Sequence, residues 1–200
     1  MTNISIITFD NFTDIDVYFL WDLMNRVKYP DWNVKILGTE KYHTSSTGLK
    51  IETHGHISET QNSDAVLFGS GQGTRNLIND TQYLSNFQLN PEKQLIGSMC
   101  SGALLLGALG LIDGKEVTTY YSVKHLLNQF NATYVDKSIV INGNIATAAG
   151  CLSAIELCVW VISRLINNEV AKEVIKSILP NGKTIEDMNL FTLNPLSQSI

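Results

Sequence analysis

The sequence predicts an α/β sandwich built on a mostly parallel sheet. Segments rich in β-branched and aromatic residues alternate along the chain with segments whose apolar residues recur at helical spacing, which is the pattern of α/β folds. The expected strand at 64–68 is a nearly continuous apolar run, as in strands that a parallel sheet buries on both faces. The length of 200 residues and the hydrophobic content of 44% suit one domain with a substantial core, so we expect a single domain over residues 1–200.

The first half of the chain contains three expected core strands and one long helix. The strands are expected at 4–9, 33–38 and 64–68, and the helix at 14–27. Val17, Leu20, Trp21 and Met24 share one face of that helix, and Pro30 marks its end. A turn with a short strand is expected over 45–51, and helical character returns from 74 into the region 83–87.

The second half opens with a strand that runs from Lys93 into a helix, almost without a loop, and that helix reaches about Leu109. Ser122 is a candidate N-cap for a helix that reaches Phe130, and Asn142-Gly143 has the composition of a hairpin turn. The other expected elements are a turn at 110–115, strands at 117–120, 133–135, 139–141 and 145–148, and helices at 152–166 and 169–178. The stretch after Pro180 shows no assignable pattern.

Composition and charge exclude several classes of protein. The formal net charge of −5 and the absence of any Lys/Arg run argue against a nucleic-acid-binding protein. The apolar run 102–112 is too short to span a membrane, and the run 151–166 is interrupted by Glu156 and Arg164. The N-terminus lacks the layout of a signal peptide. Three cysteines without CxxC spacing indicate neither a disulfide framework nor a zinc cluster, so we expect a cytoplasmic protein with reduced thiols.

Cys100 lies at the joint between strand and helix in the segment 93–107, and small residues follow it. A side chain on such a joint stands on a sharp turn at the carboxyl edge of the sheet, which is the position of the nucleophile in α/β hydrolases. A helix N-terminus also favours negative charge, so we expect Cys100 to ionise more readily than a free thiol. The pattern alone equally allows a buried core cysteine, because free cysteine is among the most buried residue types.

Ligand sites of parallel sheets lie beyond the carboxyl ends of the strands. Three loops should meet there: the loop after Phe9, the glycine-rich loop 69–73 and the Cys100 turn. Asp16 is placed to exchange a proton with a substrate, although its charge would also stabilise the positive end of its helix. The glycine-rich loop lacks the Lys-Ser/Thr ending of a phosphate-binding loop. Gly71 with the amide of Ser101 is a candidate oxyanion hole, and a plain turn is the alternative.

No histidine stands out as a base for a catalytic cysteine, although histidine is its usual partner. The four histidines are His43, His54 and His56, between the second and third core strands, and His125 within an expected helix. The His54/His56 pair lacks further ligands at a recognisable metal-binding spacing, and no metal site is predicted. Cys151 follows a strand and a glycine ahead of a helix and is therefore a rival nucleophile, whereas Cys158 is expected in the core.

The segment Gly97–Ala103, with Leu106-Gly107 and the turn 110–115 after it, resembles the nucleophile elbow and following turn of the ThiJ/PfpI superfamily. Three further segments match in the same order: 9–22 its first helix, 64–73 its third strand and oxyanion loop, and 147–154 its last strand-to-helix turn. The resemblance covers most of the chain. It implies a flavodoxin-like three-layer sandwich related to the class I glutamine amidotransferases.

The resemblance also implies roles for individual residues. Cys100 becomes the nucleophile and Cys151 does not. Protease-like members carry histidine directly after the cysteine, whereas Ser101 stands there in this chain, as in the isonitrile hydratases and the amidase-like domains of some transcription regulators. Asp16 is then the general acid/base, and Ser101 helps to position the acid.

Two positions depart from the pattern of that branch. Where many members have Thr-Thr-His, this chain has Thr118-Thr119-Tyr120, which places tyrosine in the substrate pocket. Where Pro-Gly-Gly is common, it has Gly69-Ser70-Gly71. Both departures alter the shape and polarity expected of the site.

The leading hypothesis is a cysteine-dependent hydratase or hydrolase of the isonitrile hydratase type that acts on a small molecule without a cofactor. The alternatives are a redox-sensing or stress-response protein, in which Cys100 is oxidised to a sulfinate, and a glyoxalase-like or amidase-like enzyme. The resemblance further implies a homodimer, and exposed apolar residues near Phe12, Tyr18 and Phe19 are candidates for its interface.

Overall fold

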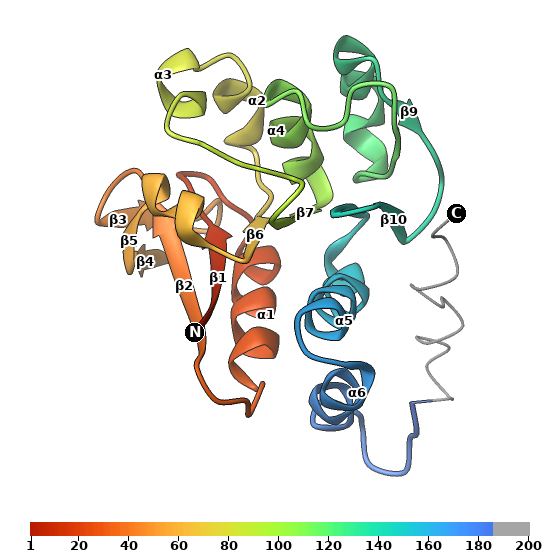
Figure 1. Cartoon of the computed structure of the whole chain (residues 1–200). Helices are drawn as coiled ribbons and strands as arrows, with labels where there is room; N and C mark the ends of the chain where they lie inside the picture. Colours follow the sequence, from red (N-terminus) through yellow and green to blue (C-terminus); the bar gives the residue numbers. More distant parts are fainter. Residues whose placement is uncertain (186–200) are drawn as a thin grey trace.

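Seven strands form the central sheet of the computed structural model, which describes residues 1–185 (Figure 1). Their order is β10-β11-β7-β6-β1-β2-β5. The strands are β1 (Thr2–Ile7), β2 (Trp32–Gly38), β5 (Gly55–His56), β6 (Ala65–Phe68), β7 (Leu95–Met99), β10 (Ile139–Asn142) and β11 (Ile145–Ala148). Every neighbouring pair is parallel except β10 and β11, which form a hairpin. The predicted α/β class with a mostly parallel sheet is therefore confirmed.

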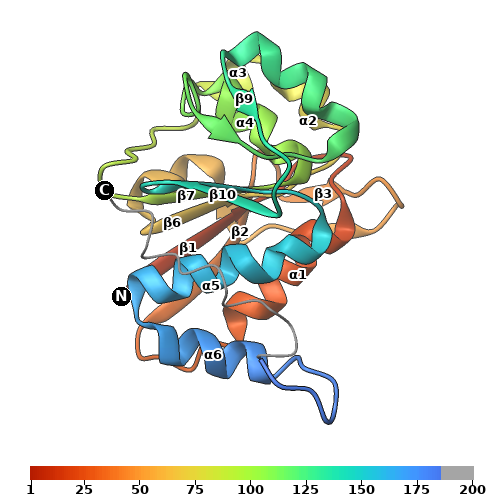
Figure 2. The ribbon, with the colours of Figure 1, turned by 90° about the vertical axis from the view of Figure 1, so that its right-hand side faces the viewer.

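Helices cover both faces of this sheet, which gives the three layers seen in Figure 2. One layer contains α1 (Asp14–Asn25), α5 (Ala154–Leu165) and α6 (Asn168–Lys176), and the other contains α2 (Thr74–Leu77), α3 (Thr81–Leu84) and α4 (Ala103–Ala108). Residues 1–185 also contain four 3-10 segments: η1 (Ile57–Asn62), η2 (Cys100–Gly102), η3 (Tyr121–Phe130) and η4 (Cys151–Ser153). Two small pairs lie outside the main sheet, β3 (Tyr42–Thr44) with β4 (Lys50–Glu52), and β8 (Glu116–Val117) with β9 (Thr133–Tyr134).

The register of the sheet brings four strand ends level with one another. Phe68 pairs with Ile7 on one side and with Ser98 on the other, and Met99 pairs with Ala148. The loops that follow β1, β6, β7 and β11 therefore open at one edge of the sheet, which is where a parallel sheet places its ligand site.

Three predicted elements differ from the structure. The helical region from 74 to 87 consists of two single turns, α2 and α3, of which α3 is capped by the Asp80 carboxylate. The segment before Phe130 is a 3-10 helix that starts at Tyr121, so Ser122 is not its N-cap. The strand expected at 117–120 ends at Val117, because the Thr118 amide donates to the Thr147 hydroxyl (2.9 Å) rather than to a strand ladder.

The surface also corrects one expectation. Phe12 is completely buried, and Tyr18 and Phe19 are partly buried against the core, so these residues do not form an exposed apolar patch. The exposed apolar side chains include Ile15, Tyr121 and Leu152 instead. Within residues 1–185, no helix combines the length and the hydropathy that spanning a bilayer requires.

Candidate active site

Cys100 stands on a strained turn directly after β7. Its φ angle is +46°, in the left-handed region where non-glycine residues are uncommon. Such a conformation costs on the order of 1–3 kcal/mol and persists where the surrounding structure enforces it. Gly102 allows the tight packing, because a Cβ there would lie 2.6 Å from the carbonyl oxygen of Gly69. The sequence-predicted elbow is therefore present, with the sulfur held at the carboxyl edge of the sheet.

Asp16 reaches the same edge from the first turn of α1. Its side chain is completely buried, and the hydroxyl of Ser70 donates a hydrogen bond to Oδ2. Oδ1 has no hydrogen-bond partner among the described residues, so it is left free to accept a proton. The resemblance implied that Ser101 helps to position Asp16. In the structure, Ser70 makes the hydrogen bond to Asp16, and Ser101 bonds to Gly71 instead. The only sequence signal for Ser70 was its place between two glycines in the loop after β6.

Three reactive groups converge at this point. The Sγ atoms of Cys100 and Cys151 and a carboxylate oxygen of Asp16 all lie within 4.8 Å of one another. Cys151 arrives from the end of β11, where it opens η4 directly after Gly150 and is half-buried. The rival nucleophile of the sequence pattern is thus a neighbour of Cys100 and not a remote core residue.

Burial controls the acidity of both thiols. Burial raises the pKa of Cys100, the Asp16 carboxylate raises it further, and the Gly150 amide lowers it only in part. Burial and Asp16 likewise raise the pKa of the Cys151 thiol to about 11. The prediction that Cys100 ionises more readily than a free thiol is therefore wrong for this structure, because desolvation and the neighbouring negative charge outweigh the short helical turn. The raised pKa favours the protonated thiol of Cys100, which lies beside the Asp16 carboxylate.

Ser101 and Gly71 bind each other across the glycine-rich loop. The Gly71 amide lies 3.1 Å from the Ser101 hydroxyl, and that hydroxyl lies 3.1 Å from the Gly71 carbonyl oxygen. The amide assigned to an oxyanion hole is therefore already engaged by a side chain. Gly71 is required at this position because its φ is +152° and a Cβ would lie 2.2 Å from the Asn11 carbonyl oxygen.

Tyr120 lies at the exposed side of the site. The Thr119 hydroxyl donates to the carbonyl oxygen of Cys100 (2.7 Å), which ties the segment before Tyr120 to the elbow. The Tyr120 ring packs against Tyr121 with 4.7 Å between ring centroids. A hydrogen bond and charge interaction with Tyr121, followed by burial, raise the pKa of Tyr120, and Cys100 and Cys151 contribute to a lesser extent. The substrate-pocket role expected for Tyr120 stays a prediction.

Three histidines make hydrogen bonds or ring contacts with residues other than Cys100. His54 accepts a hydrogen bond from the Ile36 amide (3.0 Å) and stacks on Trp21, and His56 caps η1. His43 is buried and accepts from the Glu40 amide (3.3 Å). None of these contacts involves Cys100, whereas a carboxylate oxygen of Asp16 lies within 4.8 Å of its sulfur.

The same three reactive groups are the residues that could hold a metal ion. A carboxylate oxygen and two thiolates suit a soft or borderline divalent ion, and binding would require both thiols to lose their protons. The raised pKa values of both cysteines oppose that loss.

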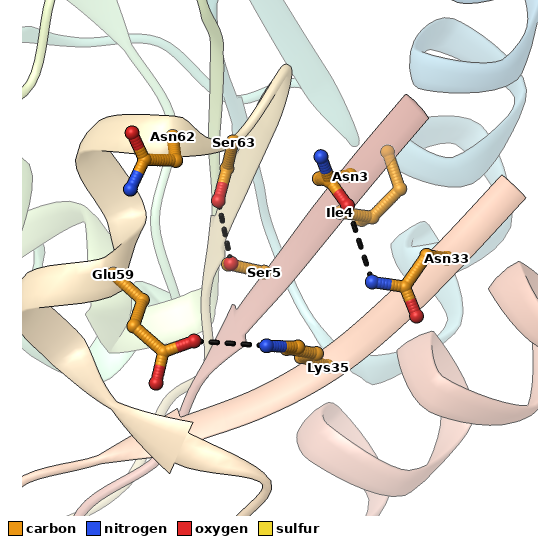
Figure 3. Close-up of a pocket in the computed structure, with 8 residues that line it drawn as sticks. All are labelled: Asn3, Ile4, Ser5, Asn33, Lys35, Glu59, Asn62 and Ser63. Carbon is orange, nitrogen blue, oxygen red and sulfur yellow. Dashed lines mark hydrogen bonds and ion pairs between the residues drawn. The ribbon is translucent and has the colours of Figure 1, made fainter. Parts of the chain in front are cut away.

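A second hollow lies away from this edge, over β1 and β2 beside η1 (Figure 3). Its volume is about 210 Å³. Its polar groups pair with each other, in the pairs Ser5–Ser63 (2.7 Å), Asn3–Asn33 (3.1 Å) and Lys35–Glu59 (2.9 Å). Neither cysteine nor histidine lines it.

The fold and the site together define an α/β protein of the flavodoxin-like class, with a cysteine on its strand-to-helix elbow and a carboxylate beside it. The profile of the DJ-1/PfpI family matches residues 2–164. The chain therefore belongs to the DJ-1/PfpI family.

Characterised relatives within this family carry different names. The chain is 30% identical over 132 residues to the isonitrile hydratase of Pseudomonas putida, with 66% of this chain and 58% of the relative aligned. It is 31% identical over 120 residues to protein dj-1beta of Drosophila melanogaster, with 58% and 63% aligned. The chain thus spans less than two thirds of either relative. It is 23% identical to the glutathione-independent glyoxalase DJ-1 of Schizosaccharomyces pombe over 89% of this chain and 98% of that one.

Solved structures share the fold at low sequence identity. A ThiJ/PfpI family protein from Pseudomonas syringae superposes with a TM-score of 0.80 at 20% identity, over 92% of this chain and 78% of that one. Schizosaccharomyces pombe DJ-1 gives 0.74 at 19% identity, over 90% of this chain and all of that one (100%). These likenesses support the flavodoxin-like architecture.

Proposed function

We propose that this protein is a cysteine-dependent hydratase that converts a small isonitrile into an N-substituted formamide in the cytoplasm. The observation that carries the proposal is the buried Asp16 carboxylate beside Cys100. Its Oδ2 accepts a hydrogen bond from Ser70, its Oδ1 has no partner among the described residues, and one of its oxygens lies within 4.8 Å of the Cys100 sulfur. A carboxylate next to a buried thiol can move protons between sulfur, substrate and water. The isonitrile hydratase named among the relatives supports this choice of substrate.

The reaction begins at the thiol of Cys100. The sulfur bonds to the terminal carbon of the isonitrile while its proton passes to Asp16, and Asp16 then delivers that proton to the same carbon. The product of this step is a thioimidate on Cys100. The Gly150 amide, which favours the thiolate form of Cys100, supports the negative charge as the proton leaves.

Water completes the cycle. Asp16 takes a proton from water as the water oxygen bonds to the thioimidate carbon, and Asp16 passes that proton to the nitrogen. The carbon–sulfur bond then breaks as the hydroxyl proton of this adduct passes through Asp16 to the Cys100 sulfur, and the N-substituted formamide leaves. Across the cycle, one isonitrile and one water give one formamide, and Asp16 returns to its starting state.

The substituent on nitrogen would lie toward Tyr120. Tyr120 is 43% exposed and packs at a tilt against Tyr121, which is 66% exposed, so both offer aromatic surface at the open side of the site. We therefore expect isonitriles with apolar substituents to be preferred over small polar ones.

A panel of isonitriles, amides and α-oxoaldehydes tests the assignment. Wild-type protein is expected to produce formamide from an isonitrile, and Cys100→Ala is expected to abolish that product. Cys158→Ala is the matched control, because Cys158 is buried within α5 and outside the site. Equal turnover by wild type and Cys100→Ala would falsify the proposal.

Glyoxalase activity is the second candidate. The observation that favours it is the alignment to the Schizosaccharomyces pombe glyoxalase, which spans nearly the whole of both chains. Methylglyoxal belongs in the panel for this reason. Turnover of methylglyoxal that depends on Cys100, without hydration of any isonitrile, would assign the protein to this second class.

We also propose that the protein is a homodimer. Ile15 and Leu152 are exposed apolar residues directly beside Asp16 and Cys151, and are 46% and 73% exposed. Burying them against a second copy would remove apolar surface from water. Sedimentation analysis should give twice the chain mass for wild type and a shift toward monomer for Leu152→Asp. A monomeric wild type contradicts this assignment.

A further inference from the structure

We propose that Cys100 and Cys151 form a reversible disulfide when the protein meets a hydroperoxide, and that this bond switches the site off. The proposal deepens the proposed function by naming a modification of the same site. It rests on that function for the loss of turnover, but not for formation of the bond.

The position of the two sulfurs supports a bond between them. Their Sγ atoms lie within 4.8 Å of each other, and both cysteines are free thiols. They follow neighbouring parallel strands, in which Met99, one residue before Cys100, pairs with Ala148, three residues before Cys151. Adjacent strands lie about 4.8 Å apart, and a disulfide needs Cα atoms about 4.4–6.8 Å apart with sulfurs at about 2.05 Å. Rotation of the side chains has to supply the remaining approach.

Mobility is unequal between the two partners. Cys100 is fixed on the elbow and only 6% exposed, whereas Cys151 is half-buried in a short 3-10 turn between Gly150 and the exposed Leu152. Cys151 is therefore the thiol that a peroxide reaches first and the side chain that can turn toward its partner. The pKa of Cys151, raised to about 11, agrees with this order because Cys100 has the more strongly raised pKa.

The chemistry balances with a hydroperoxide as the oxidant. The Cys151 sulfur attacks one peroxide oxygen, the O–O bond breaks, and the thiol proton goes to the departing oxygen. This step gives a sulfenic acid on Cys151, and water or an alcohol. Cys100 then gives its proton to Asp16, and its sulfur attacks the sulfur of Cys151. The S–O bond breaks, and hydroxide leaves as water with the proton from Asp16.

The outcome is the oxidation of two thiols by two electrons and the reduction of one hydroperoxide. The nucleophile is consumed in the bond, so hydration stops. A dithiol restores both thiols by exchange. A second thiol within reach also intercepts the sulfenic acid before further oxidation to the irreversible sulfinic acid.

Mass spectrometry of the full-length protein tests the bond directly. Hydrogen peroxide is added to the reduced wild type, free thiols are alkylated, and the intact mass is measured. The expected product has lost two hydrogen atoms and gained no oxygen. Trypsin should then release the peptide 94–115, which contains Cys100, joined to the peptide 138–164, which contains Cys151 and Cys158.

Two variants identify the cysteine that forms the disulfide with Cys100. Cys158→Ala should still form the cross-link, and Cys151→Ser should not. Turnover of wild type should fall in proportion to the cross-linked fraction and return after dithiothreitol. A wild type that keeps all its thiols, gains oxygen on Cys100 without the cross-link, or links Cys100 to Cys158 overturns the proposal.

The two proposals fail separately. A cross-link that forms in a protein without hydratase activity leaves the disulfide standing and removes the proposed function. An active hydratase that is oxidised only to a sulfinate on Cys100 leaves the function standing and removes the disulfide.

Discussion

Two strand-to-helix junctions lie side by side in this protein and differ in one backbone feature. Cys100 follows β7 and opens η2 ahead of α4, and Cys151 follows β11 and opens η4 ahead of α5. At the first junction, the cysteine itself takes the positive φ of +46°. At the second, Gly150 takes a φ of +79° and the cysteine comes one residue later.

The side chains show what this difference does. Cys100, whose own backbone is strained, is nearly buried at the edge of the sheet. Cys151, which follows the strained Gly150, is only half-buried. We expect the Cys151 side chain to reorient more readily than that of Cys100, because it is less buried. Both sulfurs nevertheless lie within 4.8 Å of the Asp16 carboxylate and of each other.

The largest expected effect is the difference in isonitrile turnover between a variant of Cys100 and a variant of Cys151. Cys100→Ala should lower turnover of the isonitrile by about 10⁴-fold or more, the scale on which the removal of a covalent nucleophile acts. Cys151→Ala should lower it far less, because that sulfur contacts the acid but forms no bond to substrate. Steady-state kinetics on both variants decides this. Equal losses would mean that the junctions are not distinct in function.

Asp16 is common to both junctions, so its substitution should act on both. Asp16→Asn should lower turnover by about 10²- to 10⁴-fold through loss of proton transfer. It should also speed alkylation of both cysteines near pH 8, because the carboxylate that raises their pKa values is gone. Iodoacetamide labelling followed over time measures this effect.

Asp14→Asn is the control for that experiment. Asp14 lies in the same first helical turn but accepts its hydrogen bond from the Thr47 hydroxyl (2.9 Å), outside the thiol cluster. It should leave both labelling rates unchanged. Slower labelling in Asp16→Asn would contradict the assigned cause of the raised pKa values.

Backbone strain at the second junction is testable through stability. Gly150 has φ +79° and ψ 155°, a conformation essentially limited to glycine. Gly150→Ala should therefore lower the free energy of unfolding by about 1–3 kcal/mol. It should also change the labelling rate of Cys151. Gly143→Ala, in the β10–β11 hairpin at φ +63°, should cost about 1 kcal/mol and leave that rate alone. Urea unfolding measures the free energy of unfolding of both variants, and iodoacetamide labelling over time measures the reaction rate of Cys151.

The last expected effect is on the pH dependence of stability, and below about pH 8.5 it is small. Burial raises the pKa values of Cys100, Cys151 and Cys158, so the folded protein keeps these protons after the unfolded chain has lost them. The unfolded thiols ionise near pH 8.5. The free energy of unfolding should therefore fall as the pH rises above that value, and the Cys151 contribution should be complete beyond about pH 11. Urea titrations at neutral and alkaline pH should show a shallower fall for Cys158→Ala.

Much of the sheet could be predicted because its strands carry strong local signals. The apolar run before Gly69 and the Asn142-Gly143 turn gave β6 and the β10–β11 hairpin. Helix type was harder to predict. The segment Tyr121–Phe130 has helical spacing but forms 3-10 turns, since its start is fixed by tertiary hydrogen bonds of Thr118 and Thr119.

The candidate site was predictable in its position and not in its electrostatics. Loops at the carboxyl edge of a parallel sheet placed Asp16 and Cys100 together, which follows from topology. Ser70 as the partner of Asp16 depends on a hydroxyl orientation that no sequence pattern encodes. The raised pKa values depend on how much solvent the folded chain removes from each sulfur, which is a tertiary property.

The completely buried carboxylate of Asp16 has one further consequence. Among residues 1–185, the ion pairs do not include it, so its charge is balanced by no cation and is directed at whatever enters beside Cys100. An anionic ligand would meet this charge with little intervening water, where repulsion between like charges is strong. We therefore expect the site to favour neutral ligands over carboxylates and phosphates.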